Sequence, residues 1–360
     1  MKQSDEKQSD EKQSDEKSCV KSRCEMCHKE FSPYGYTRHL NRKVPCVLKL
    51  ENTPVLRVFP KPLLKWVGGK TQLLDTLLDS FPKEMNHYHE IFLGGGSVLL
   101  AFLQEVQHKR LQVGRIHAYD LNEPLIHVYK NIQSSPHELY EAIQALIQSF
   151  HECGDGILNR APTTLEEAKS NKENYYYWAR RGYNQLDAEA KKGINGSALF
   201  IFLNKTCFRG VYREGPHGFN VPFGHNKNPS VFCPAHLREI SELIQPVIFT
   251  TAPFTQSLRE AKIRHFVYMD PPYYPLNAET FVGYLKGGFK EKDHEEFFNT
   301  CHLMTASGVK FSMSNAAVDM LLTRFPGPTY TTKKIECKRA IHSKNPAAKA
   351  EEFIITNCVY

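Results

Sequence analysis

Apolar residues recur at helical spacing in four stretches of this chain, 73–81, 98–106, 237–244 and 293–306. Side chains at positions i, i+3, i+4 and i+7 lie on one face of a helix, so each stretch predicts an amphipathic helix. Residues 131–249 are more polar and mostly helical in pattern, with a glycine-rich hairpin or extended loop near their end. Helical periodicity would bury part of the aromatic cluster Tyr175-Tyr176-Tyr177-Trp178 in this region.

Short apolar runs between these stretches predict strands. They end in polar or glycine-rich residues, and they lie at 89–93, 116–119, 247–250, 266–269, 309–312 and 352–357. We expect the last run at the sheet edge or in a final hairpin. Strands that alternate with helices predict an α/β fold, which binds ligands at the carboxyl ends of its strands.

The run 266–269 ends in Asp270-Pro271-Pro272-Tyr273. Two prolines cannot continue a hydrogen-bond ladder, so the strand stops and Asp270 lies at its carboxyl end. The tetrapeptide offers a carboxylate, a backbone carbonyl and an aromatic face, which suit a planar base held by its amino group. A strand that merely ends in Asp-Pro is the alternative interpretation.

A glycine-rich turn follows the run 89–93, in Gly94-Gly95-Gly96-Ser97. Glycines between a strand and a helix let a ligand approach the backbone closely, as nucleotide-binding turns require. Asp120, after the next strand, is placed to accept hydrogen bonds from ribose hydroxyls. The alternative is that Asp120 caps the helix that begins near Glu123.

Two common nucleotide motifs are excluded by single residues. Gly69-Lys70-Thr71 resembles the end of a phosphate loop, but that motif needs glycine at position 64, which is Leu64. The dinucleotide fingerprint needs a third glycine at position 99, which is Leu99, so nicotinamide binding is disfavoured.

The first 57 residues differ from the rest in composition. Residues 1–17 hold a Lys-Gln-Ser-Asp-Glu repeat with four Lys and six acidic residues, net −2, and no apolar residue beyond Met1, so we expect a disordered tail. Residues 18–57 hold eight basic and three acidic residues, net +5, out of +7 for the chain. This excess suits a nucleic-acid contact, and a solvated basic linker is the alternative.

Cys24, Cys27, His39 and Cys46 have the spacing Cys-x2-Cys-x11-His-x6-Cys, which suits tetrahedral Zn²⁺. We expect a short helix over 36–41 that carries His39. The pattern resembles a C2H2-type zinc finger in which a cysteine replaces the last histidine. A segment of reduced cysteines without metal is the alternative, as are Cys19 and His28 as ligands. A finger of this size could bind DNA, RNA or protein.

No apolar run is long enough to cross a membrane, and the charged N-terminus does not resemble a signal peptide. We therefore expect an intracellular protein, cytoplasmic or nuclear, with its ten cysteines reduced. A finger fused to a bacterial-type enzyme would fit a eukaryotic or large-virus source.

Five motifs in the region 58–360 occur in the order found in one enzyme family: 65–70, 92–96, 120–122, 219–224 and 270–273. In this order the chain resembles DNA adenine-N6 methyltransferases of the Dam/DpnII type (D12 class). The resemblance implies a Rossmann-like α/β sheet that binds S-adenosylmethionine, with a mainly helical DNA-recognition domain inserted before Asp270. The resemblance divides this region into a catalytic domain (61–130 and 250–360) and a target-recognition domain (131–249). It does not cover the N-terminal part, where we expect a tail (1–17), a zinc-finger-like segment (18–50) and a linker (51–60).

The resemblance also implies roles for single residues. Trp66, Lys70, Phe92, Gly94, Asp120 and Asp270 would contact the cofactor, and Asp270, Pro271 and Tyr273 would hold the target adenine. Lys65, Arg213 and Pro222 match positions that face double-stranded DNA, and the chain would act as a monomer. The family commonly carries Asn two residues after the reading Arg, where this chain has Gly215, and this difference weakens an assignment of GATC as the target.

Other readings remain open from the sequence. A cytosine-N4 or RNA methyltransferase would use a similar pocket, although those enzymes more often carry Ser or Asn in place of Asp270. A catalytically inactive zinc-finger DNA-binding protein is the alternative outside enzymes, and the retained Lys70, Asp120 and Asp270 argue against it.

Overall fold

The computed structural model describes residues 22–24, 27, 29–31, 33–41, 57–226, 229, 232–275, 288–338 and 349–358. Contacts divide the chain into two compact units, Met1–Val58 and Phe59–Tyr360. The expected tail at 1–17 and most of the expected linker at 51–60 lie outside the described residues. None of the described helices is both long and apolar enough to span a membrane.

The small unit consists of a two-stranded hairpin and one helix. Strand β1 (Ser22–Arg23) pairs antiparallel with β2 (Glu30–Phe31), and α1 (Pro33–Leu40) follows. The helix begins three residues before the expected start at position 36, because proline fits the first turn of a helix, where no N–H partner is needed.

The large unit is organised by a seven-stranded sheet in the order β10-β11-β9-β8-β3-β4-β7. The five strands from β9 to β7 are parallel, and β11 and β10 are antiparallel additions. The strand bounds are β3 (Glu84–Glu90), β4 (Gln112–Asp120), β7 (Val247–Thr251), β8 (His265–Met269), β9 (Lys310–Ala316), β10 (Thr331–Lys338) and β11 (Lys349–Thr356).

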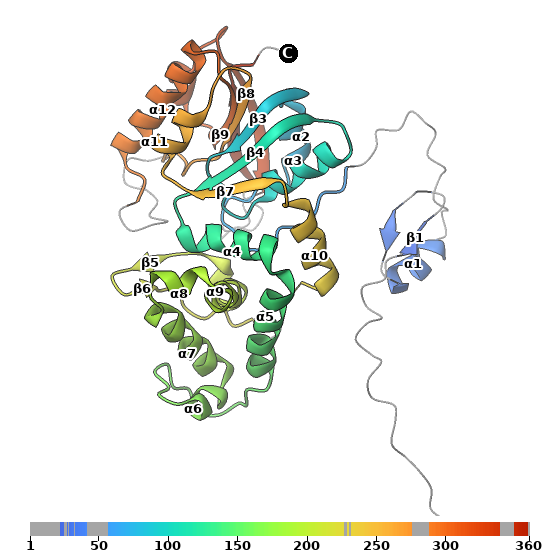
Figure 1. The fold of residues 1–360 in the computed structure, drawn as a ribbon, viewed down its shortest axis with the longest axis vertical. Helices are drawn as coiled ribbons and strands as arrows, with labels where there is room; N and C mark the ends of the chain where they lie inside the picture. The colour runs from blue at the N-terminus through green and yellow to red at the C-terminus, as the bar shows by residue number, and fades with distance from the viewer. Residues whose placement is uncertain are drawn as a thin grey trace, which may run out of the picture. The chain divides into compact units, whose positions relative to one another are not determined.

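Helices cover both faces of this sheet (Figure 1). Alternate residues of β8 show the two sides: Phe266 and Tyr268 belong to one buried core, and Val267 and Met269 belong to a second core. These helices and short helical turns are α2 (Leu74–Asp79), α3 (Ser97–Gln107), α11 (Phe254–Ser257), η3 (Leu258–Glu260), α12 (Glu291–Ala306) and α13 (Asp319–Arg324). The α/β fold predicted from the sequence is confirmed.

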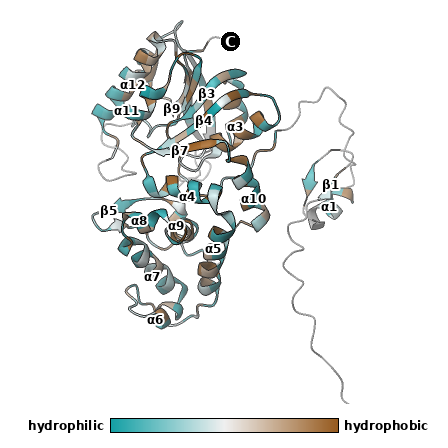
Figure 2. Cartoon of the chain, viewed as in Figure 1, coloured by the Kyte–Doolittle hydropathy of each residue, from teal (hydrophilic) through white to brown (hydrophobic). Residues whose placement is uncertain are grey.

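A mainly helical segment connects β4 to β7 and lies beside one end of the sheet in Figure 1. Its elements are α4 (Glu123–Ser134), α5 (Pro136–His151), α6 (Leu165–Lys169), α7 (Lys172–Gln185), α8 (Ala188–Lys192), α9 (Ile194–Thr206), η2 (Phe208–Gly210), β5 (Glu214–Gly215), β6 (Gly218–Phe219) and α10 (Pro234–Leu243). Helix α9 is buried along most of its length and is largely brown in Figure 2, so it forms the core of this segment. Contacts do not separate the segment from the sheet.

The two C-terminal strands refine the sequence expectation. The run 352–357 belongs to β11, which lies second from the edge and pairs with β10 in a hairpin. The expectation of an edge strand or a final hairpin is thus confirmed by the hairpin, in which β10 forms the sheet edge. Strand β10 itself was not predicted, because its alternation of Lys, Glu and Thr has too few apolar residues to indicate burial.

Candidate active site

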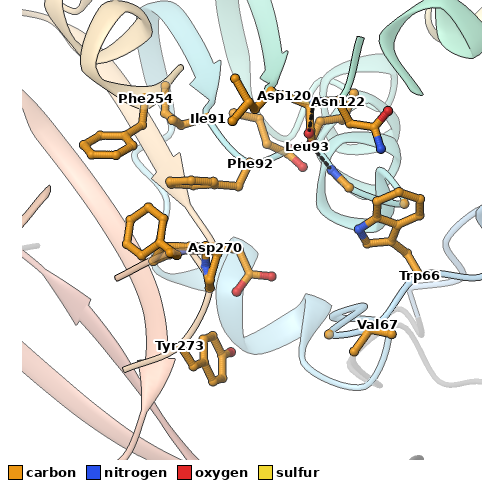
Figure 3. Close-up of a pocket in the computed structure, with 18 of the residues that line it drawn as sticks. Trp66, Val67, Ile91, Phe92, Leu93, Asp120, Asn122, Phe254, Asp270 and Tyr273 are labelled. Carbon is orange, nitrogen blue, oxygen red and sulfur yellow. Dashed lines mark hydrogen bonds between the residues drawn. The ribbon is translucent and has the colours of Figure 1, made fainter. Parts of the chain in front are cut away.

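A cavity of about 530 Å³ lies at the carboxyl ends of β3, β4 and β8. Among the described residues, its lining includes every cofactor and catalytic position expected from the sequence: Trp66, Lys70, Phe92, Gly94, Asp120, Asp270, Pro271 and Tyr273. In the view of Figure 3, the carboxylate of Asp270 lies between the rings of Phe92 and Tyr273. The structure therefore brings together residues that are up to about 200 positions apart in the chain, because parallel strands share one carboxyl edge.

Asp270 is held on one side only. Its Oδ2 lies 2.6 Å from Nζ of Lys70, whose side chain is 3% exposed. Its Oδ1 is buried and has no hydrogen-bond partner among the described residues. Burial raises the pKa of Asp270 to about 6, and the Lys70 ammonium opposes this rise. Since an unpartnered buried carboxylate oxygen is costly, this oxygen is suited to a donor on a ligand.

The turn after β3 is shaped by glycine. Gly94 and Gly96 have φ angles of +50° and +69°, which side chains rarely adopt. A Cβ on Gly94 would lie 2.7 Å from Cδ1 of Trp66, so the indole packs directly on the turn. Trp66 also stacks near Tyr212, with ring centroids 5.9 Å apart. The missing side chains thus place an aromatic wall beside the backbone N–H groups that precede α3.

Asp120 connects two of the strand-end loops. Its Oδ2 accepts a hydrogen bond from the Gly94 N–H at 2.9 Å, and its Oδ1 accepts one from the Asn122 N–H at 2.9 Å. Burial raises the pKa of Asp120, and these backbone N–H groups oppose the rise. The N-cap of α4 is Asn122, which accepts from the Leu125 N–H at 3.0 Å. The alternative in which Asp120 caps this helix is therefore wrong.

Apolar rings form another wall of the cavity. Phe92 lies 6.2 Å from Phe254 and 5.8 Å from Phe297 between ring centroids. Phe289 lies 6.3 Å from Phe92 between ring centroids.

Tyr273 is contacted at its hydroxyl and over one face of its ring. Its hydroxyl donates to Oε2 of Glu352 at 2.6 Å, and the Lys70 ammonium lies 5.1 Å from its ring centroid. The backbone N–H of the next residue, Tyr274, donates to Oδ1 of Asn315 at 2.9 Å. These contacts hold the loop after β8 against β9 and β11.

The sequence reasoning missed several of these supporting residues. Glu90 is 2% exposed, accepts from the Tyr88 hydroxyl at 2.8 Å, and has a pKa raised to about 8 by burial. Glu352 and Asn315 reach the site from β11 and β9. Asn315 ends a predicted strand next to β8, which is a usable signal, whereas nothing local in the sequence marks Glu352.

The three positions expected to face DNA are all exposed. The Lys65 N–H donates to Oδ1 of Asn204 at 2.8 Å, which fixes its backbone on α9. Nε of Arg213 donates to Oδ1 of Asn220 at 2.7 Å. The Pro222 carbonyl accepts from the Phe208 N–H at 2.9 Å. The backbones of Lys65 and Pro222 are therefore held in place, and the exposed side chain of Arg213 is bound to Asn220.

In the small unit, the structure brings together three of the four expected metal ligands. One ligand atom from each of Cys24, Cys27 and His39 lies within 4.8 Å of the others. Sγ of Cys27 is 3.3 Å from Nε2 of His39, and the His39 ring stacks on Phe31 with centroids 4.2 Å apart. Cys46 lies outside the described residues.

Comparison with known proteins agrees with the geometry of the cavity. Residues 66–341 match the family described as D12 class N6 adenine-specific DNA methyltransferase. The chain is 33% identical over 307 residues to the type II methyltransferase M.MjaIII of Methanocaldococcus jannaschii, covering 82% of this chain and 99% of the relative. It is 29% identical over 231 residues to a DNA adenine methylase of Haemophilus influenzae, covering 64% of this chain and 70% of the relative.

A DNA adenine methylase of Escherichia coli is 26% identical over 297 residues, which cover 82% of this chain and 94% of the relative. The family match includes all the cavity-lining residues discussed above, and it excludes both Glu352, which supports Tyr273, and the N-terminal unit. The chain belongs to the D12 class of N6 adenine-specific DNA methyltransferases, enzymes that transfer a methyl group to N6 of adenine in DNA.

Proposed function

We propose that Asp270 and the backbone carbonyl of Pro271 accept the two hydrogens of the adenine N6 amine during this reaction. The observation that carries the proposal is Oδ1 of Asp270, which is buried and unpartnered among the described residues, on a side chain that lines the cavity. Lys70 already holds Oδ2 and keeps the carboxylate ionised. A donor from the target base would complete the hydrogen bonding of this group.

The exocyclic amine of adenine is a poor nucleophile because its lone pair is delocalised into the ring. Two acceptors on its hydrogens would favour a pyramidal nitrogen whose lone pair points away from the ring plane. Fixed acceptors of this kind act by positioning and electrostatics, so a strong general base is not needed. With a pKa of about 6, Asp270 could also take up the proton that N6 releases.

The cavity residues fit S-adenosylmethionine, the methyl donor expected for this family. When bound, this cofactor supplies an electrophilic methyl group on a positively charged sulfur. Asp120 would accept hydrogen bonds from the ribose hydroxyls, since each of its oxygens has a lone pair beyond the backbone bond it accepts. Trp66 and Phe92 would enclose the flat and apolar parts, and Gly94 would permit close approach.

The target adenine must leave the duplex to reach Asp270, which costs a few kcal/mol. The ring of Tyr273 is half-buried and held by Glu352, so it offers a fixed face on which an extruded base can stack. Stacking on an aromatic side chain contributes about 1–3 kcal/mol and offsets part of the cost.

We propose that residues 131–249 form the target-recognition part and that Lys65, Arg213 and Pro222 contact a short double-stranded site. GATC is the candidate that the family resemblance supplies. A Cβ at Gly215 would lie 2.5 Å from Nδ2 of Asn220, which is itself bound to Arg213. The family Asn at this position therefore does not fit unless Asn220 moves, and sequencing of methylated DNA would identify the target.

We propose separately that the N-terminal unit binds Zn²⁺ through Cys24, Cys27, His39 and Cys46. Its hairpin and helix already gather three ligand groups, as a zinc finger requires. Metal analysis of the purified chain checks this: Cys24→Ser should lose one zinc per chain, whereas Cys153→Ser, a partly buried cysteine of the large unit, should not. An unchanged zinc content in Cys24→Ser would contradict the proposal.

The test of the catalytic proposal is methyl transfer from radiolabelled S-adenosylmethionine to duplex DNA, followed by nucleoside analysis. The parent should yield N6-methyladenine and no N4-methylcytosine, and RNA should not be labelled. Asp270→Ala should lose transfer but retain DNA binding, with Asp155→Ala as an exposed control. Near-normal turnover of Asp270→Ala would refute the assignment.

A further inference from the structure

Four histidines gather on one face of the sheet, away from the cavity. His87 and His89 lie on β3, His117 on β4 and His265 on β8, which are neighbouring parallel strands. The register pairs His89 with His117 and His87 with His265. Because side chains alternate along a strand, His87 and His89 share a face, and Glu90 of the cavity lies on the other.

The imidazoles form a compact array. The rings of His87 and His265 lie 4.1 Å apart between centroids and those of His89 and His117 lie 4.8 Å apart, with interplanar angles of 10° and 9°. Nε2 of His117 is 3.2 Å from Nδ1 of His87, and Nε2 of His89 is 2.9 Å from Nδ1 of His265. One ligand atom from each of His87, His89 and His117 lies within 4.8 Å of the other two.

The neighbours of His89 determine its tautomer. The Tyr119 hydroxyl donates its hydrogen to Oε2 of Glu260 at 2.7 Å. Its oxygen, 3.3 Å from Nδ1 of His89, can then only accept, so Nδ1 of His89 carries the hydrogen. In the neutral ring, Nε2 of His89 therefore presents its lone pair to the other imidazoles. This chain of carboxylate, hydroxyl and imidazole is the kind of support that orients metal-binding histidines.

We propose that His87, His89 and His117 bind a divalent transition-metal ion, with Zn²⁺ the best match, and that Tyr119 and Glu260 orient His89. Three imidazoles are the protein ligands of zinc in carbonic anhydrase. Zinc–nitrogen bonds of about 2.1 Å at tetrahedral angles place nitrogens about 3.4 Å apart, close to the separation between His117 and His87. Nδ1 of His265 lies 2.9 Å from Nε2 of His89. On metal binding, the His265 ring would either rotate away from this nitrogen or act as a fourth ligand.

Other properties of the array agree with this proposal. His87 and His117 are half-buried, which gives an ion access from solvent. The positive charges of Arg115 and Lys262 near His87 oppose a cation, whereas Glu260 near His117 favours one.

The site would be structural and not part of methyl transfer. Asp270 follows His265 by five positions along the same strand, which at about 3.3 Å per residue separates them by about 16 Å. The array joins three neighbouring strands of the central sheet, so an ion bound there would stabilise their pairing.

The experiment measures Zn²⁺ binding by the full chain in a Cys24→Ser, Cys27→Ser background, which removes the proposed N-terminal zinc site. This background should bind about one zinc per chain and melt at a higher temperature with zinc than without. His87→Gln with His117→Gln should abolish both effects, and exposed His151→Gln should change neither. Tyr119→Phe should weaken binding about 10–100-fold, since it removes only the support of His89.

Co²⁺ provides a second readout that needs no histidine variant to fold. In the same background, bound Co²⁺ should show ligand-field absorption without a thiolate charge-transfer band, because the ligands are imidazoles. Absence of zinc binding in a folded background chain would overturn the proposal, and so would unchanged affinity in the double histidine variant. A thiolate band would likewise contradict it.

Discussion

The carboxyl ends of β3, β4 and β8 differ sharply from the sheet face along the same strands. At the carboxyl ends, acidic side chains meet backbone N–H groups and a lysine, as Asp120 does with Gly94 and Asp270 with Lys70. On the face, imidazoles meet mainly each other and a tyrosine hydroxyl. Both regions collect polar groups on the same three strands, but the groups have opposite chemical character.

The difference follows from where free backbone groups occur. Within the sheet, ladder hydrogen bonds use the backbone N–H groups, so a carboxylate on the face would find few donors. Past the strand ends, the ladder stops and the glycine turn presents N–H groups that a carboxylate can accept. Neutral imidazoles can both donate and accept, which allows them to pair with one another on the face. The strand ends therefore suit polar substrates, and the face suits a metal ion.

The largest effect among variants that keep Asp270 is expected for Lys70→Met. Loss of the ammonium should raise the pKa of Asp270 above its value of about 6, by about 1–3 units for a neighbouring opposite charge. The ionised carboxylate is the active form, so kcat/KM of the parent should fall as pH drops through about 6, and in the variant this fall should begin at higher pH. At pH 7 a rise of this size leaves between about half and about one hundredth of the carboxyl groups ionised, so we expect kcat/KM to decrease about 2–100-fold.

The pH dependence of kcat/KM, measured for the parent, Lys70→Met and exposed Lys83→Met, checks this. Lys83→Met should follow the parent. An acidic limb that stays at the parental pH in Lys70→Met would show that Lys70 does not control Asp270.

An effect of similar size, but confined to cofactor binding, is expected for Asp120→Ala, which should raise the KM for S-adenosylmethionine about 10–100-fold and leave kcat nearly unchanged. Hydrogen bonds to a charged group contribute about 1.5–3 kcal/mol, and they would be lost equally in the ground and transition states. Steady-state kinetics at varied cofactor concentration measure the split. The KM of Asp120→Asn for S-adenosylmethionine should lie between the values of the parent and of Asp120→Ala. A decrease in kcat with an unchanged KM would contradict the ribose role.

The exposed positions near the cavity should separate two kinds of DNA contact. Arg213→Ala should cost about 1–3 kcal/mol on the preferred site and relax specificity, as expected for a base contact. Lys65→Ala should weaken binding on all sequences alike and reduce the salt dependence by about one phosphate contact. Fluorescence anisotropy with target and scrambled duplexes at several salt concentrations distinguishes these outcomes. If both variants weakened binding equally on the target and the scrambled duplex, Arg213 would not be a base contact.

The smallest effect is expected for His117→Gln on methyl transfer, because sites this far apart act nearly independently. Turnover at saturating substrates should stay within about twofold of the parent, even where zinc binding is lost. A large loss of kcat with the fold intact, as judged by circular dichroism, would mean that the face and the strand ends are coupled.

The sequence predicted those parts of the site that depend on local chemistry. Asp270-Pro271 ends a buried strand, and Gly94 follows another, so backbone constraints alone indicated a ligand site. Asp120 follows the next strand, so it was predicted at the same ligand site. These features could be predicted because each depends on a strand end, which local composition marks.

The remaining features depend on pairing between distant segments. The four histidines meet only through the register of β3 with β4 and β8, which no single stretch encodes. His87 and His89, two apart in a strand, were the one local sign of a shared face. Glu352 reaches Tyr273 through the antiparallel addition of β11, and the Lys70–Asp270 pair joins residues 200 positions apart.

The most direct test of the account is the methyl-transfer rate of Asp270→Ala on duplex DNA, measured beside its DNA affinity and product nucleoside. We predict that the rate falls by at least about 10³-fold while DNA binding persists, and that the parent's product is N6-methyladenine. Turnover within tenfold of the parent, or a product methylated elsewhere, would contradict the central claim that Asp270 holds the adenine amine.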